Sequence, residues 1–161
     1  MKPRVYLETT IPSYLASRPS RDLVVAAHQQ VTWDWWRGAR QRFELFISEL
    51  VLEEIRAGDA EAAARRSEFV VDLPVLRIDD EVRILARAYQ EELGLPGSAD
   101  VLHIASAVRY EMDYLITWNC AHIANGAVIR RLMQANVRLR RSTPLVLTPD
   151  ALLEPGTGDA P

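Results

Sequence analysis

Apolar residues along the chain fall into short runs, typical of buried strands, and longer stretches with helical spacing. Short apolar-rich runs predict five strands, at residues 4–7, 43–47, 75–78, 114–117 and 145–147. The clearest helical stripe contains Val101, Ile104, Ala105, Val108 and Met112. Because parallel strands need long crossover connections, strands that alternate with helices indicate a parallel sheet with helices on both faces. The pattern therefore predicts an α/β fold.

Capping residues set the expected helix boundaries. The residues expected to cap helix starts are Thr10, Asp22, Ser48, Asp79 or Asp80, and Ser98. Gly58 and Gly94 follow two of the helical stretches and favour helix ends there. The apolar spacing of Val24, Ala27, Val31 and Trp35 predicts the buried face of the second helix. The last helix is expected over residues 122–136.

Length and composition fit one globular domain over residues 1–153. The chain has 161 residues, of which 48% are hydrophobic and 25% are charged, so a wholly disordered chain is excluded. Residues 154–161 contain two Pro and two Gly and predict a disordered tail. No apolar run approaches the roughly 20 residues that span a bilayer, and no export signal is visible. We therefore expect a cytoplasmic protein without a membrane partner.

Charge is unevenly distributed along the chain. The net charge is −3, yet residues 120–149 contain no Asp or Glu. That stretch carries five arginines: Arg130, Arg131, Arg138, Arg140 and Arg141. Such an asymmetry permits an anionic partner despite the acidic total, and a solvated arginine face is an equally good interpretation.

Acidic residues stand where ligands bind to parallel sheets. Glu8 follows the first strand, Glu53 and Glu54 come one helical turn after the second, and Asp100 opens the helix before the fourth. Asn119 follows the fourth strand. Because the carboxyl ends of parallel strands meet at one edge, these side chains are expected to gather there. Clustered carboxylates favour a bound cation, and oxygen ligands favour Mg²⁺ or Mn²⁺.

Each residue also has a purely structural interpretation. Glu8 and Asp100 could simply favour a helix N-terminus, and at least one of Glu53 and Glu54 is expected to be solvated. No spacing joins His103, His122 and Cys120 into a metal site, so these three are interpreted as structural. The tryptophans Trp33, Trp35 and Trp36 indicate helix core or a protein contact more than base stacking.

Four segments together resemble the motifs of the PIN-domain family. They are residues 5–15 (VYLETTIPSYL), 47–55 (ISELVLEEI), 98–107 (SADVLHIASA) and 115–119 (LITWN). They occur in the family's order, with suitable intervening lengths, and the resemblance covers about residues 4–148. The chain looks most like VapC-type toxins of bacterial toxin–antitoxin pairs.

The resemblance implies a three-layer α/β/α sandwich with a central parallel sheet of about five strands. It implies a Mg²⁺- or Mn²⁺-dependent endoribonuclease that leaves a 5′-phosphate and a 3′-hydroxyl. The implied metal and catalytic residues are Glu8, Glu54, Asp100 and Asn119, supported by Thr9 and Thr117. The basic stretch Arg130, Arg131, Arg138, Arg140 and Arg141 would then contact the RNA backbone. A small antitoxin protein and a homodimer are the implied partners.

Two departures from the family pattern leave an alternative open. Glu8 stands where Asp is usual, and Asn119 stands where an acid is usual. These changes also fit a catalytically weak or inactive PIN-like module that binds RNA or a protein partner. A phosphate-handling α/β domain is a poorer alternative, because the chain has no glycine-rich phosphate loop and only one lysine, Lys2.

Overall fold

A five-stranded sheet forms the centre of the protein, as a computed structural model covering residues 1–154 shows. The strands are β1 (Arg4–Leu7), β2 (Glu44–Ser48), β3 (Val75–Leu76), β4 (Tyr114–Ile116) and β5 (Leu145–Leu147). All pairings are parallel, and the order is β3-β2-β1-β4-β5. The predicted parallel sheet is confirmed, with β1 at its centre.

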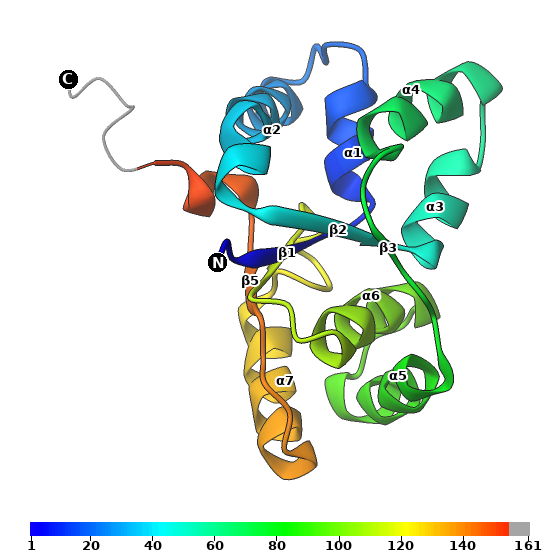
Figure 1. Cartoon of the computed structure of the whole chain (residues 1–161), viewed down its shortest axis with the longest axis vertical. Coiled ribbons are helices and arrows are strands. Elements are labelled where there is room, and N and C mark those ends of the chain that lie inside the picture. Colours follow the sequence, from blue (N-terminus) through cyan, green and yellow to red (C-terminus); the bar gives the residue numbers. More distant parts are fainter. Residues whose placement is uncertain (155–161) are drawn as a thin grey trace.

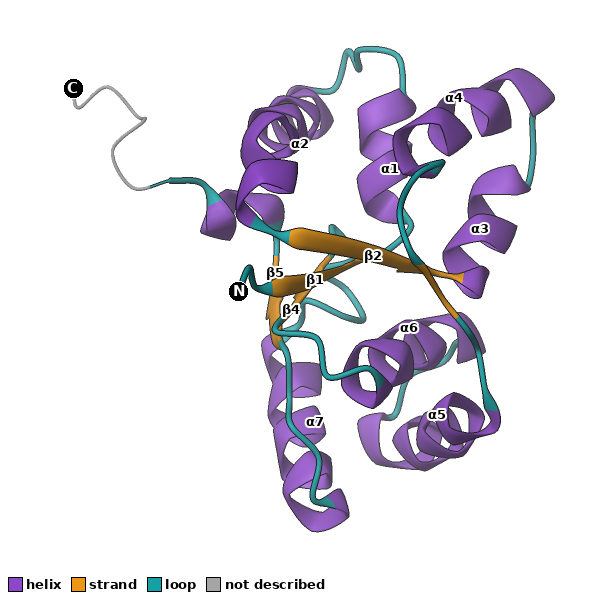
Figure 2. Cartoon of the chain, viewed as in Figure 1, coloured by secondary structure: helices purple, strands orange, loops and turns teal. Residues whose placement is uncertain are grey.

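Helices cover both faces of this sheet (Figure 1). On one face lie α1 (Thr10–Ala16), α2 (Leu23–Arg42), α3 (Glu49–Arg56) and α4 (Ala60–Val70). On the other face lie α5 (Asp80–Leu93), α6 (Ser98–Arg109) and α7 (Gly126–Leu139). A short 3₁₀ turn, η1 (Pro149–Leu152), follows β5. Figure 2 shows the three layers, with the strands in orange between two layers of purple helices, and confirms the predicted α/β/α sandwich.

Side-chain caps explain several helix starts. Asp22 accepts hydrogen bonds from the backbone N–H groups of Val24 and Val25, as expected for a residue that satisfies the free donors of a first turn. Ser48 caps α3 and Asp79 caps α5 in the same way. Gly94 ends α5 in the left-handed conformation that glycine favours, with φ of 64°.

The expected starts of three helices were wrong. The N-cap residue of α1 is Thr9, because the Thr10 hydroxyl donates to Glu8 instead of capping the helix. Gly97, without a side-chain cap, precedes α6. The last helix begins at Gly126 instead of residue 122, because a turn intervenes in which Asn119 accepts from the N–H of His122.

The core lies on both sides of β1. Val5, Tyr6 and Leu7 are fully buried, and the predicted stripe of α6 is buried as well. The predicted buried face of α2 is wrong at its start, because Val24 is 64% exposed and the buried residues of the helix are Thr32, Trp35 and Ala39. Of the three tryptophans, Trp35 is core, as one interpretation expected.

The end of the described chain returns to α2. Arg42 donates to the carbonyl oxygen of Leu152, and its guanidinium lies 3.5 Å from the carboxylate of Glu154. The rest of the tail for which disorder was predicted, residues 155–161, lies outside the described residues. Within residues 1–154, no helix has the length and apolar character needed to cross a membrane.

Candidate active site

The sheet register places the ends of β1, β2 and β4 at one level. Tyr6 pairs with Phe46 in β2, and Leu7 pairs with Ile116 in β4. The next residue of β1, Glu8, donates its backbone N–H to Ile116 at 3.1 Å. Glu8 therefore leaves the sheet beside Thr117, which follows β4, and beside Ser48, which caps α3.

Glu8 is a buried carboxylate that its neighbours orient. It is 5% exposed. Its Oε2 accepts from the Thr10 N–H at 3.0 Å, the Thr10 hydroxyl at 2.5 Å and the Thr117 hydroxyl at 2.8 Å. Its other oxygen, Oε1, lies 4.0 Å from Nε2 of His103. Three donors on one oxygen fix the carboxylate and turn the second oxygen toward His103.

Glu54 reaches the same place from α3. Its Oε1 accepts from the Thr9 hydroxyl at 2.7 Å and lies 2.6 Å from His103 Nε2. Partial burial by itself would raise the pKa of this carboxyl. The hydrogen bond and charge of His103, helped by the hydrogen bond of Thr9, outweigh burial and lower the pKa of Glu54. Its neighbour Glu53 is exposed, as expected for one of the pair.

A buried chain of polar groups holds His103 in turn. His103 is 1% exposed, and its Nδ1 lies 2.7 Å from the hydroxyl of Tyr6. That hydroxyl also lies 2.8 Å from Oγ of Ser48. Burial, together with the charges of Glu8 and Glu54, raises the pKa of Tyr6 well above its ordinary value, although the hydrogen bond from Ser48 opposes this. Tyr6 is therefore a neutral phenol that fixes the ring of His103.

Asp100 extends from the first turn of α6 to the residues after β4. Its Oδ1 accepts from the side-chain amide of Asn119 at 3.0 Å, and its Oδ2 lies 2.9 Å from Nδ1 of His122. The Asn119 backbone N–H donates to the Thr117 hydroxyl, which donates to Glu8. One hydrogen-bonded network thus connects Asp100 with Glu8.

The donor set suits Mg²⁺ or Mn²⁺ in its chemistry, because three carboxylates supply hard oxygen atoms. Glu8 Oε1 and Glu54 Oε2 accept no hydrogen bond from the described residues. Both oxygens of Asp100 are engaged by Asn119 and His122. Among the described residues, no three His, Cys, Asp or Glu side chains form a group that could hold a metal ion. The carboxylates therefore suit the ion in their chemistry, although in this arrangement they do not form a metal-binding group.

The side chain of Asn119 contacts two neighbours in this arrangement. Its amide nitrogen faces Asp100, and its oxygen accepts from the backbone N–H of His122 at 3.0 Å. The oxygen that would ligate a metal is therefore used to hold the turn after β4. In this arrangement Asn119 positions Asp100.

Sequence reasoning missed two histidines that contact the acidic residues. His103 contacts Glu54, and His122 contacts Asp100. For His103 the sequence signal was its spacing from Asp100. His103 follows Asp100 by three residues on α6, so both residues lie on one side of that helix. The residue spacing typical of ligands to one metal ion does not identify these histidines, because each histidine contacts a carboxylate from a distant segment.

The arginines of the basic stretch are partly engaged elsewhere. Arg138 pairs with Glu92, Arg141 pairs with Glu81, and Arg131 donates to the carbonyl oxygen of Leu93 at 3.0 Å. These contacts fasten α7 and the following loop to α5. Contact with the RNA backbone stays a prediction, and it suits the exposed Arg130 and Arg140 better than the three engaged arginines.

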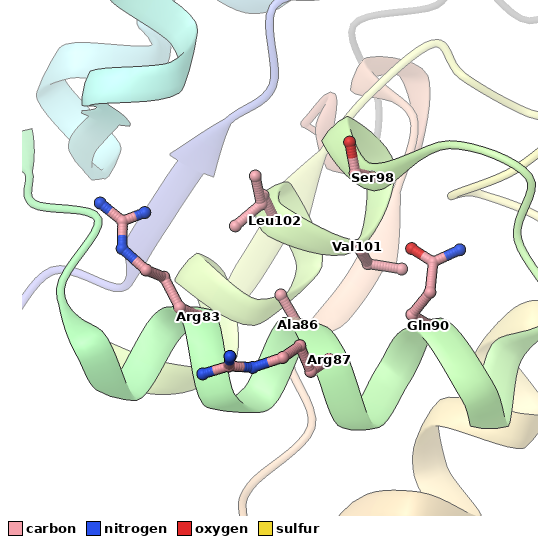
Figure 3. Close-up of a pocket in the computed structure, with 7 residues that line it drawn as sticks. All are labelled: Arg83, Ala86, Arg87, Gln90, Ser98, Val101 and Leu102. Carbon is pink, nitrogen blue, oxygen red and sulfur yellow. The ribbon is translucent and has the colours of Figure 1, made fainter.

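A groove between α5 and α6 is separate from the acidic network (Figure 3). Its volume is about 290 Å³, and Ala86, Val101 and Leu102 supply apolar side chains to it. Arg83 and Arg87 extend from α5 on one side. None of the candidate acids lines this groove, so the groove and the acidic network are different features.

The protein is a three-layer α/β/α domain, and the central strands of its parallel sheet end beside acidic and threonine side chains. The family model described as PIN domain matches residues 6–119. The chain therefore belongs to the PIN-domain family. Members of this family are generally nucleases and generally use divalent metal ions.

A solved structure has the same fold. It is the crystal structure of VapBC2 from Rickettsia felis, which is described as bound to a DNA fragment from the VapBC2 promoter. The match has a TM-score of 0.60 and 15% sequence identity, and it covers 90% of this chain and 98% of the matched chain. No curated protein matches the chain by sequence.

Proposed function

We propose that this protein is a divalent-metal-dependent endoribonuclease and the toxin of a toxin–antitoxin pair. The observation that carries the proposal is the set of polar contacts among Glu8, which follows β1, Glu54 from α3 and Asp100 from α6. Hydrogen bonds through Thr117 and Asn119 join Glu8 with Asp100, and His103, which contacts Glu54, lies 4.0 Å from Glu8. Family membership supports the same reaction class.

In the proposed reaction each side chain has a distinct task. Glu8, Glu54 and Asp100 would hold Mg²⁺ or Mn²⁺. The ion, when bound, supplies positive charge to the phosphodiester oxygens and acidifies water. Around them, Thr10 and Thr117 orient Glu8, while Thr9 and His103 orient Glu54.

Cleavage of RNA in the presence of Mn²⁺ tests the proposal. We expect the wild-type chain to cleave a single-stranded RNA and the Asp100→Asn variant to lose this activity by more than about 100-fold, beyond the 10–100-fold typical of residues that only support a ligand. Glu54→Gln should behave alike. The matched control is Glu53→Gln, which removes the adjacent exposed carboxylate.

Two results would contradict the proposal, the first for the nuclease activity and the second for the role of Glu54. One is equal cleavage by the wild type and by Asp100→Asn, which would assign the activity to a contaminant. The other is an effect of Glu53→Gln as large as that of Glu54→Gln. The second result would mean that loss of charge on α3, not loss of the oriented carboxylate, causes the defect.

The hydrogen bonds of Asp100 favour a second candidate function. Because Asn119 and His122 engage both of its oxygens, the chain could be a catalytically weak or inactive module that binds RNA or a protein partner. Binding of RNA without cleavage at any Mn²⁺ concentration would support this alternative. Cleavage that Asp100→Asn abolishes would exclude it.

The toxin role requires partners. The VapBC2 structure of the same fold is described as bound to promoter DNA, which supports the proposal that a small antitoxin accompanies this chain in the cytoplasm. We also propose that the chain forms a homodimer. Light scattering of the purified protein measures its oligomeric state, and co-purification with the product of an adjacent small gene measures antitoxin binding. A monomer without such a partner would contradict the toxin role and leave the nuclease assignment intact.

A further inference from the structure

Three half-buried aromatic rings lie beside the acidic network and take no part in it. They are Tyr14 from α1, His28 from α2 and Trp118 from the segment after β4. The rings of His28 and Trp118 stack, with centroids 4.0 Å apart and planes inclined by 13°. Tyr14 lies 6.0 Å from Trp118 and 6.2 Å from His28. Tyr14, His28 and Trp118 are called the aromatic cluster below.

Hydrogen bonds fix Trp118 at both ends. Its backbone N–H donates to the Thr10 hydroxyl at 2.8 Å, and its indole N–H donates to the Thr32 hydroxyl at 2.8 Å. Thr32 in turn donates to the carbonyl oxygen of His28 at 2.6 Å. The ring is therefore ordered before any ligand arrives, which lowers the entropic cost of stacking against it.

The same bonds bring the cluster next to Glu8. The Thr10 hydroxyl that accepts from Trp118 donates to Glu8 Oε2 at 2.5 Å. On either side of Trp118 in sequence, Thr117 contacts Glu8 and Asn119 contacts Asp100. A strand whose phosphodiester lies at these acids would carry its neighbouring base to the aromatic cluster.

We propose that the aromatic cluster is a stacking site for an unpaired base of single-stranded RNA, next to the bond that is cleaved. The proposal rests on the proposed function for the identity of the ligand. Unstacked bases of single strands bind to aromatic side chains, whereas paired bases are already stacked within a duplex. The groove of Figure 3 is a poorer site for this base, because none of its lining side chains is aromatic.

The test measures affinity for RNA and not cleavage. The Asp100→Asn chain is titrated into a fluorescent single-stranded oligonucleotide, and then into versions that carry one abasic nucleotide at successive positions. We expect one abasic position to weaken binding by about 5- to 100-fold, the range that stacking of one base supplies. The Tyr14→Leu variant should show the same loss with intact RNA and no further loss with that abasic RNA.

Two further variants keep the test decisive. His28→Ala changes a half-buried residue of α2, and it should reproduce the loss even if Tyr14→Leu fails to fold. The matched control is Tyr110→Leu, because Tyr110 is an aromatic residue at the far end of α6 from Asp100. It should bind RNA as the Asp100→Asn parent does, and none of these variants should change affinity for a duplex.

Several outcomes would overturn the stacking site. One is an equal loss of affinity for RNA in His28→Ala and in Tyr110→Leu. Another is a series of abasic oligonucleotides that all bind equally well. A third is a set of variants that lose binding to a protein partner but keep their affinity for RNA. The test also separates the two proposals. If the wild type fails to cleave RNA but one abasic position weakens binding to the parent and not to Tyr14→Leu, the nuclease assignment fails, and the cluster stands as a stacking site for a base of bound RNA.

Discussion

His103 Nε2 lies 2.6 Å from Oε1 of Glu54 and 4.0 Å from Oε1 of Glu8. A single buried imidazole therefore stands between two carboxylates that come from different elements. Its other nitrogen faces Tyr6, so the ring cannot turn without breaking a buried contact. The position of Glu54 thus depends on a residue in the centre of β1.

Loss of this imidazole should weaken metal binding. In the His103→Leu variant Glu54 keeps only the bond from Thr9, and its carboxylate becomes free to rotate. We expect the affinity for Mn²⁺ to fall by about 10- to 100-fold, as for other residues that orient a ligand. Calorimetric titration measures this. Unchanged affinity in a folded variant would show that Glu54 is positioned without His103.

Removal of the Tyr6 hydroxyl should lower stability. Tyr6→Phe leaves His103 Nδ1 and the Ser48 hydroxyl without their common partner in a buried site. We expect the free energy of unfolding to fall by about 1–3 kcal/mol, the usual cost of an unsatisfied buried group. Urea unfolding measures it. Tyr110→Phe is the control, because its hydroxyl bond to Arg77 is exposed, and a loss of equal size there would contradict the argument.

An acid at position 119 should make stability depend on the metal. Asn119→Asp replaces a donor to Asp100 with a second negative charge, so the metal-free protein should lose about 1.5–3 kcal/mol, the worth of a hydrogen bond to a charged group. A bound cation would offset the repulsion, so Mn²⁺ should bind more tightly than to the wild type. Thermal unfolding with and without Mn²⁺ measures both effects. A variant that Mn²⁺ stabilises no more than it stabilises the wild type would refute the prediction.

Stability should decline in alkaline solution because of two buried tyrosines. Burial raises the pKa of both Tyr6 and Tyr89. The folded state therefore keeps its protons where the unfolded chain, with an ordinary pKa of about 10, loses them. The contribution of the two tyrosines to the free energy of unfolding is complete below pH 10. Above pH 10 the free energy of unfolding falls by at most about 1.4 kcal/mol per pH unit for each tyrosine. Urea unfolding between pH 8 and 11 measures the slope, which Tyr6→Phe and Tyr89→Phe should each reduce.

The carboxylates and histidines of the candidate site differ in how far the sequence could predict them. Glu8 and Asp100 follow from strand ends and a helix start, because parallel topology brings such positions to one edge. His103 and His122 were interpreted as structural, since their partners lie 49 and 22 residues away. The choice of Glu54 over Glu53 came from the motif resemblance, and α3 turns Glu54 toward Thr9 while Glu53 is exposed.

The order of strands and helices was determined by local properties of the sequence: apolar runs, helical spacing and capping residues such as Asp22 and Asp79. Those properties act between neighbours in the chain, and together with the motifs they were enough to predict a parallel sheet and the family. Tertiary structure alone decided which polar groups meet. The engagement of Arg138 by Glu92, the turn of Asn119 toward Asp100 and the stacking of His28 on Trp118 all join distant segments. Such contacts depend on how helices pack across the sheet, and no pattern within one segment encodes them.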